Sequence, residues 1–102
     1  MKNWNEEEDL GGIEGVVLTD VLSEIMAALV GGYSILCVYE EKNINLNDAR
    51  LLQWKNRREE IGYIRDHFKG DKSYKDMRRW IGTYSKELKT VNDLRKKYQN
   101  VS

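Results

Sequence analysis

The chain has 102 residues, with no proline, one cysteine, one histidine and a formal net charge of zero. Without proline, nothing in the sequence forces a helix to break, and the many Leu, Lys, Arg and Glu residues favour long helices. The lone Cys37 excludes an intramolecular disulfide, which suits a reducing cytoplasm. The first ten residues, MKNWNEEEDL, do not have the basic start and apolar run of a secretory signal. We therefore expect a helical cytoplasmic protein.

The same scarcity argues against enzymatic chemistry. A structural zinc site needs clustered Cys or His ligands, and the chain offers only Cys37 and His67. The acidic run Glu6–Asp9 does not have the alternating spacing of a calcium loop. Neither Gly11-Gly12 nor Gly31-Gly32 precedes the Gly-Lys-Ser/Thr of a phosphate-binding loop. We expect a non-enzymatic protein with no cofactor and no metal.

Charge is distributed unevenly along the chain. Residues 1–44 hold two lysines against nine acids, whereas residues 45–102 hold fifteen Lys and Arg against eight acids. Residues 1–12 are predicted to be an acidic flexible tail, and residues 13–102 a single helical domain. The asymmetry indicates either that this tail docks on basic helices or that a basic surface meets an anionic partner.

The segment 16–42 is the most apolar part of the chain and is predicted to form a first long helix. Several of its aliphatic residues share one heptad register, and a monomer of this length has little core in which to bury so much apolar surface. These residues predict self-association through the first helix: Leu18, Leu22, Ile25, Leu29 and Leu36. The stretch Ile25–Tyr39 carries no charge but is shorter than the ~20 residues of a membrane span, so no membrane partner is expected.

Gly31-Gly32 leaves an alternative for this segment. If Gly31 capped the helix, residues 33–40 would form a strand paired with residues 13–18 or with a second chain, giving an α+β fold. A continuous helix with two interior glycines costs roughly 2 kcal/mol relative to alanine, and a neighbouring helix packed there can offset this. We favour the continuous helix.

Two further helices are predicted at about 46–68 and 73–99. Asn45 followed by Asp48 predicts the start of the second helix, and Ser73 is expected to cap the third. The second helix places Trp54, Ile61 and Phe68 at seven-residue intervals on one face. The predicted fold is all-α, with three long helices. Because the connections between them are short, we expect neighbouring helices to be antiparallel.

The third helix combines an apolar seam with a basic strip. Its apolar positions repeat at three and four residues, which places them on one face: Tyr74, Met77, Ile81, Tyr84, Leu88, Val91 and Tyr98. Seven cations lie away from this seam and form the basic strip, a candidate contact for a protein partner or for phosphates: Lys75, Arg78, Arg79, Lys86, Lys89, Lys96 and Lys97.

Residues 74–93 resemble a helix-turn-helix. The resemblance rests on apolar residues around a turn glycine: Met77, Ile81, Gly82, Leu88 and Val91. It implies a turn at Gly82, with Ser85, Lys86, Lys89 and Thr90 on a recognition helix. An unbroken heptad helix fits the same residues and also accounts for Tyr74 and Tyr84.

Together these features predict a small regulator or inhibitor that works by protein–protein binding and self-associates through its first helix. The composition would also suit a phage or mobile-element product. The competing hypothesis is a regulator that binds DNA or RNA through the basic strip of the third helix. The two hypotheses stay open at this point.

Overall fold

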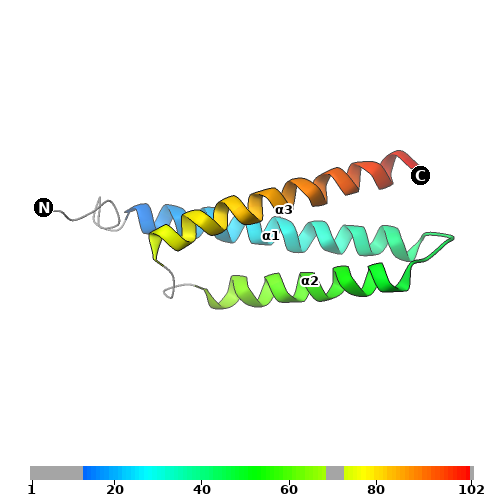
Figure 1. Cartoon of the computed structure of the whole chain (residues 1–102), viewed down its shortest axis with the longest axis horizontal. Coiled ribbons are helices and arrows are strands. Elements are labelled where there is room, and N and C mark those ends of the chain that lie inside the picture. The colour runs from blue at the N-terminus through cyan, green and yellow to red at the C-terminus, as the bar shows by residue number, and fades with distance from the viewer. Residues whose placement is uncertain (1–12, 69–72, 102) are drawn as a thin grey trace, which may run out of the picture.

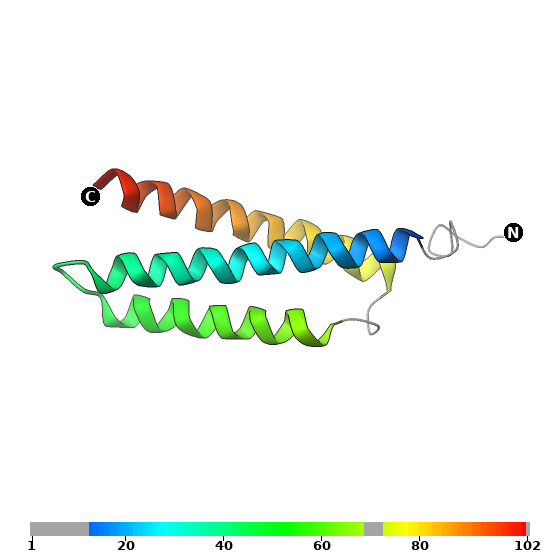
Figure 2. The same ribbon diagram turned by 180° about the vertical axis from the view of Figure 1, so that it is seen from behind.

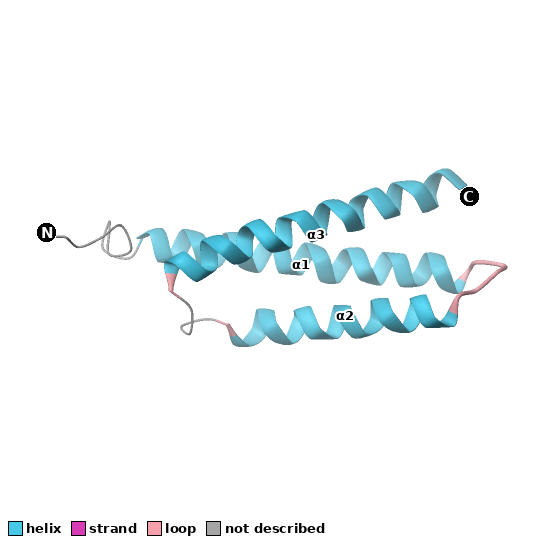
Figure 3. Cartoon of the chain, in the orientation of Figure 1, coloured by secondary structure: helices cyan, strands magenta, loops and turns pink. Residues whose placement is uncertain are grey.

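The computed structural model describes residues 13–68 and 73–101, which form three helices (Figure 1): α1 (Ile13–Glu41), α2 (Asp48–His67) and α3 (Tyr74–Val101). Figure 3 shows helices and short loops but no strand among the described residues. The prediction of an all-α fold is confirmed. The α+β alternative is wrong, because α1 runs unbroken through residues 33–40. The predicted acidic tail, residues 1–12, lies outside the described residues.

α1 lies between the other two helices and is the only one that packs extensively on both (Figures 1 and 2). Consecutive helices run in opposite directions, so α1 and α3 run in the same direction. Side-chain contacts agree with this order, since Glu14 pairs with Arg78 near the start of both helices and Glu40 bonds to Tyr98 near their ends. The three helices therefore form a three-helix unit with α1 at its centre.

The core lies on the side of α1 that faces the other two helices. Its fully or nearly fully buried residues come from all three helices and from the residue that follows α2: Leu22, Met26, Leu29, Tyr33, Leu36, Cys37, Trp54, Ile61, Phe68, Met77, Tyr84 and Val91. On α1 the buried positions recur mostly every three or four residues, and on α2 and α3 they recur every seven, as the heptad spacing of the sequence predicts.

The two glycines in α1 have different surroundings. Gly31 is exposed, and a β-carbon added there would have no neighbour within 4 Å. Gly32 is buried, and a β-carbon there would lie 2.6 Å from Cγ1 of Val91 on α3. The bare backbone of Gly32 therefore lets α3 approach α1 closely. This packing offsets part of the cost of an interior glycine.

The start of α2 differs from the prediction. Asn47, not Asn45, caps the helix, and its side-chain oxygen accepts a hydrogen bond from the Arg50 N–H at 3.0 Å. Asn45 instead lies in the preceding turn, where its N–H donates to Asn43 Oδ1 at 3.0 Å. Both asparagines suit a cap, but only Asn47 directly precedes the first residue of α2, as a capping residue must.

The start of α3 agrees with the prediction. The Asp76 N–H donates to Ser73 Oγ at 3.1 Å, and the Met77 N–H donates to the Ser73 carbonyl at 2.9 Å. Ser73 therefore satisfies one of the N–H groups that the first turn of a helix leaves free.

α3 is continuous through Gly82, so the helix-turn-helix interpretation is wrong. Gly82 is exposed, and a β-carbon added there would have no neighbour within 4 Å. The apolar residues that matched the motif belong to one uninterrupted face instead. Any nucleic-acid contact by α3 would have to be made by a straight helix.

A buried carboxylate joins the end of α1 to both neighbours. Glu40 is fully buried and accepts hydrogen bonds from the Asn47 N–H at 2.8 Å and from the Tyr98 hydroxyl at 3.0 Å. The Arg50 guanidinium lies 3.7 Å from the same carboxylate and donates to the Tyr98 hydroxyl at 2.7 Å. A charge buried this deeply is tolerated only when it is paired and hydrogen-bonded, which fixes α2 and α3 at this end.

Candidate interaction surfaces

The side of α1 opposite the core carries a second apolar stripe, here called the open face. Its members, all apolar except Glu24, recur every three or four residues and so share one side of the helix: Val17, Val21, Glu24, Ala28, Gly31, Ile35 and Val38. Val17 is 51% exposed and Val38 is 45% exposed. Figure 2 shows α1 from the side on which neither α2 nor α3 crosses in front of it. Neither α2 nor α3 therefore covers the open face, and most of its residues are exposed among the described parts of the chain.

An uncovered apolar stripe is unusual on a helix of a soluble protein. Such a helix normally presents polar residues to water, and one that is apolar all round is buried in a larger core or in a membrane. By length and composition alone, the span Glu14–Glu41 could cross a membrane, and only 39% of its most apolar window is buried inside the fold. The open face thus has the character of an interface.

The residues predicted to mediate self-association lie elsewhere on α1. Leu22, Leu29 and Leu36 are fully buried against α2 and α3, and Leu18 and Ile25 are half-buried against the same core. Their heptad register points inward because α2 and α3 pack on that side. In this fold, the surface that α1 offers to another molecule is the adjacent register of the open face.

The basic strip of α3 is exposed along its whole length. Three of its seven cations are paired within the chain: Arg78 with Glu14, Arg79 with Asp76 at 2.8 Å, and Lys89 with Asp93 at 3.2 Å. The other four form no ion pair with another described residue: Lys75, Lys86, Lys96 and Lys97. The strip is therefore less positive than its residue count indicates.

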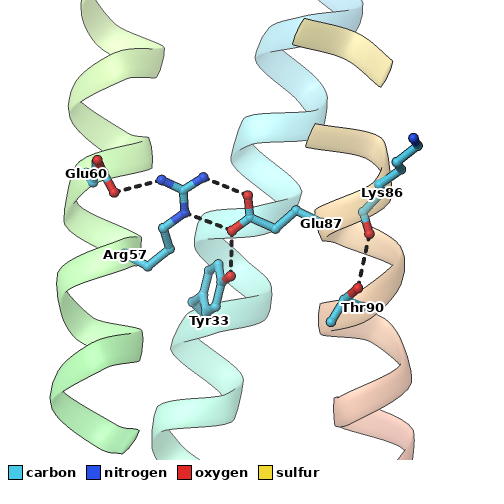
Figure 4. Close-up of polar contacts among 6 residues, drawn as sticks. All are labelled: Tyr33, Arg57, Glu60, Lys86, Glu87 and Thr90. Carbon is cyan, nitrogen blue, oxygen red and sulfur yellow. Dashed lines mark hydrogen bonds and ion pairs between the residues drawn. The ribbon is translucent and has the colours of Figure 1, made fainter. Parts of the chain in front are cut away.

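One polar cluster links all three helices (Figure 4). Arg57 of α2 donates from Nε and Nη2 to the two carboxylate oxygens of Glu87 on α3, at 2.8 and 2.7 Å. The Tyr33 hydroxyl of α1 donates to Glu87 at 2.5 Å, and Arg57 also donates to Glu60 at 2.7 Å. A two-point Arg–carboxylate contact is among the strongest polar interactions in proteins. The cluster holds α2 and α3 together across the core side of α1.

The pKa values of the cluster follow from these contacts. The Arg57 hydrogen bonds lower the pKa of the Glu87 carboxyl, so it stays ionised. Burial, and then the hydrogen bond to Glu87, raise the pKa of the Tyr33 hydroxyl well above its usual value. The contact with Glu87 also raises the pKa of the Arg57 guanidinium. All three groups therefore keep fixed protonation states near neutral pH, as suits a structural brace and not a proton-transfer site.

A shallow polar hollow of about 430 Å³ adjoins this cluster. Its lining comes from α1 and α2: Tyr33, Gln53, Trp54, Asn56, Arg57 and Glu60. Both charged members are already paired with each other, so the hollow offers few free groups to a ligand. Among residues 13–68 and 73–101, no three Asp, Glu, His or Cys side chains gather as metal ligands.

Cys37 and His67, the only cysteine and histidine of the sequence, lie on different helices in surroundings that suit structural roles. Cys37 is 3% exposed in the core, and burial raises the pKa of its thiol. His67 stacks on Tyr63 with ring centroids 4.0 Å apart, and its Nδ1 lies 2.7 Å from the Tyr63 carbonyl. Neither residue contacts the other.

Reasoning from the sequence missed the open face as a separate surface, although its signal is present. Positions 17, 21, 28, 35 and 38 repeat apolar residues at helical spacing, in the register one residue before that of the predicted self-association residues such as Leu18, Leu22 and Leu29. It also missed the cluster of Tyr33, Arg57 and Glu87. These residues are 24 to 54 positions apart, and helical periodicity does not relate side chains across separate helices.

We compared the chain with protein-family models, curated protein sequences and solved structures, and none of the three comparisons gave a match.

Proposed function

We propose that this protein is a small, non-enzymatic regulator or inhibitor that works by protein–protein binding, and that the open face of α1 is its binding surface. The observation that carries the proposal is the exposure of Val17, Val21 and Val38 on the uncovered side of a helix whose other side is core. Burying such side chains is favourable by about 25 cal/mol per Å² of apolar area, so a complementary helical surface would bind there.

The open face also suits a partner that is itself helical. Its apolar residues form one straight stripe, and Ala28 and Gly31 at its middle allow a second helix to approach closely. A helix laid on an apolar stripe is a recurring mode of protein recognition. An inhibitor that works by occupying a partner's surface needs no chemistry beyond this contact.

Photo-crosslinking in the native cells tests the proposal. A photoreactive phenylalanine analogue is placed at Val17 or at Val38, both on the open face. The matched control carries it at Tyr63, which is 64% exposed on α2 and lies outside the open face. We expect protein adducts from Val17 and Val38, and few from Tyr63. Lipid adducts from the open face, or equal adducts from all three positions, would contradict the proposal.

A nucleic-acid regulator is the second candidate. The observation in its favour is the set of four lysines on α3 that form no ion pair with another described residue: Lys75, Lys86, Lys96 and Lys97. Because α3 is straight, such binding would be to the phosphate backbone and independent of base sequence.

A further inference from the structure

We infer that the open face of α1 binds the same face of a second copy of this chain, with the two α1 helices antiparallel. The inference rests on the proposed function, because it names the partner of the same surface. Four observations carry it: the charges in or beside the two halves of the face, the spacing of its apolar residues, the small residues at its middle, and the position of Arg58.

Charges of opposite sign lie in or beside the two halves of the open face, and they form no ion pair with another described residue. Asp20 and Glu24, in the first half of α1, are exposed and form no ion pair with another described residue. Lys42, directly after α1, and Arg58, on α2 beside its second half, likewise form no ion pair with described residues. One half of the face is therefore acidic and the other basic.

This arrangement selects the direction of the second copy. In a parallel pair, Glu24 would face Glu24 and Asp20 would face Asp20, and like charges opposed across an interface are unfavourable. In an antiparallel pair, the acidic half of each copy faces the basic half of the other. The face is then complementary to itself, as a two-fold symmetric interface requires.

The apolar residues fix a register for the antiparallel pair. The open-face residues are spaced alternately four and three positions apart. When a second copy of the helix is laid antiparallel on the first, residues with this spacing meet in pairs, one pair to a layer. The layers then place Val21 against Val38, Glu24 against Ile35, and Ala28 against Gly31. The two smallest side chains thus lie beside the two-fold axis, where the helices are closest. A β-carbon at Gly31 would have no neighbour within 4 Å in the single chain, so this close approach is unobstructed.

The same register gives each Glu24 a counter-ion. Arg58 Nη1 lies 3.4 Å from Ser34 Oγ, which places its guanidinium beside the level of Ile35. Because Glu24 lies opposite Ile35 of the second copy, it lies near Arg58 of that copy. Two such Glu24–Arg58 pairs would form, one on each side of the two-fold axis.

Single cysteines in the full-length chain test the direction and register. In the antiparallel pair, the two Val21 positions lie about 25 Å apart along the axis, at 1.5 Å of rise per residue. Under mild oxidation, Val21→Cys alone and Val38→Cys alone should therefore give no covalent dimer, whereas an equimolar mixture of the two should. Ala28→Cys alone should also crosslink, since it lies beside the axis. The native chain is the control, because its only cysteine, Cys37, is 3% exposed.

The other outcomes overturn the inference. A covalent dimer from Val21→Cys alone would show a parallel pair. If Ala28→Cys crosslinks but the mixture does not, the register is wrong. If no variant crosslinks, and the native chain sediments as a monomer, the second copy is not the partner. The proposed function would then still stand if Val17 and Val38 photo-crosslink to another protein, so the two failures are distinguishable.

A charge swap provides an independent readout. Glu24→Arg should weaken dimerisation roughly three- to tenfold, and adding Arg58→Glu should restore it. A circular dichroism spectrum like that of the native chain would show that each variant folds. Loss of dimerisation that the second substitution does not restore would count against the Glu24–Arg58 pairing.

Discussion

Gly32 of α1 and Val91 of α3 lie so close that a β-carbon on Gly32 would come within 2.6 Å of the valine Cγ1. The neighbouring Gly31 lies about 100° further around the same helix, and a β-carbon added there would have no neighbour within 4 Å. Two adjacent glycines therefore have opposite roles, and their alanine variants form a matched pair.

Gly31→Ala should raise the free energy of unfolding of the single chain by about 0.5–1 kcal/mol, because alanine loses less backbone entropy in a helix. Gly32→Ala should lower it by about 1–3 kcal/mol, because Val91 has no room to move aside in a packed core. Urea titration at low, fixed protein concentration measures both. Equal effects of the two substitutions would mean that α3 does not approach α1 at Gly32.

Glu87 should make the folded chain lose stability as the pH falls into the acid range. Its pKa is lowered in the folded chain, so its contribution is present above the unfolded value of about 4.3 and is lost as the pH falls through the lower folded value. Glu87→Gln should cost about 1–2 kcal/mol at neutral pH and reduce the loss of stability below pH 4.3. The control Glu60→Gln, at a side chain that is 60% exposed, should cost less than about 1 kcal/mol. Identical pH profiles for the native chain and Glu87→Gln would contradict the role given to the Arg57–Glu87 contact.

Tyr33 should make the folded chain less stable at alkaline pH. Its folded pKa is raised, so above pH ~10 the unfolded chain loses the hydroxyl proton first and stability falls as the pH rises. Tyr33→Phe should therefore flatten the stability curve between about pH 10 and 11. The substitution should also cost about 1 kcal/mol at neutral pH, since Glu87 loses a hydrogen bond. Thermal unfolding at stepped pH measures both effects, and an unchanged alkaline slope would show that Tyr33 ionises freely in the folded chain.

The basic strip makes a separate prediction about nucleic acid. If the four lysines of the strip that pair with no other described residue bind phosphates, affinity for a mixed duplex should fall about a hundredfold between about 50 and about 200 mM salt. Lys86→Glu with Lys96→Glu should then abolish binding, whereas Lys89→Glu should weaken it less, because Lys89 is already paired with Asp93. Under the protein-binding proposal we expect little affinity even at 50 mM salt. Tight, salt-sensitive binding would favour the nucleic-acid candidate instead.

The sequence was sufficient to predict the helices, because their apolar residues repeat at helical spacing and no proline interrupts them. Leu22 and Leu29 were correctly placed on a packing surface, yet the sequence could not say which molecule packs there. A heptad register that faces a neighbouring helix of the same chain looks identical to one that faces a second chain. Only the positions of α2 and α3 show that this register points inward.

The polar contacts were less accessible to sequence reasoning. Glu40 ends the most apolar stretch of the chain, and its partners Asn47 and Tyr98 are 7 and 58 residues away. Nothing local in the sequence separates this buried acid from its exposed neighbour Glu41, which is 50% exposed and pairs with Lys55. Burial of one of two adjacent acids is decided by the rotation of α1 against its neighbours.

The mass of the protein in solution, measured by sedimentation over a range of concentrations, bears directly on the role of the open face. We expect the native chain to reach twice its 12.0 kDa mass, and Ile35→Glu to remain a monomer, since the substitution puts a charge in the apolar stripe. Leu52→Glu is the matched control, because Leu52 is an equally apolar residue that is 59% exposed on α2. A native chain that stays monomeric at every concentration, or a dimer that Ile35→Glu leaves intact, would contradict self-association through the open face of α1.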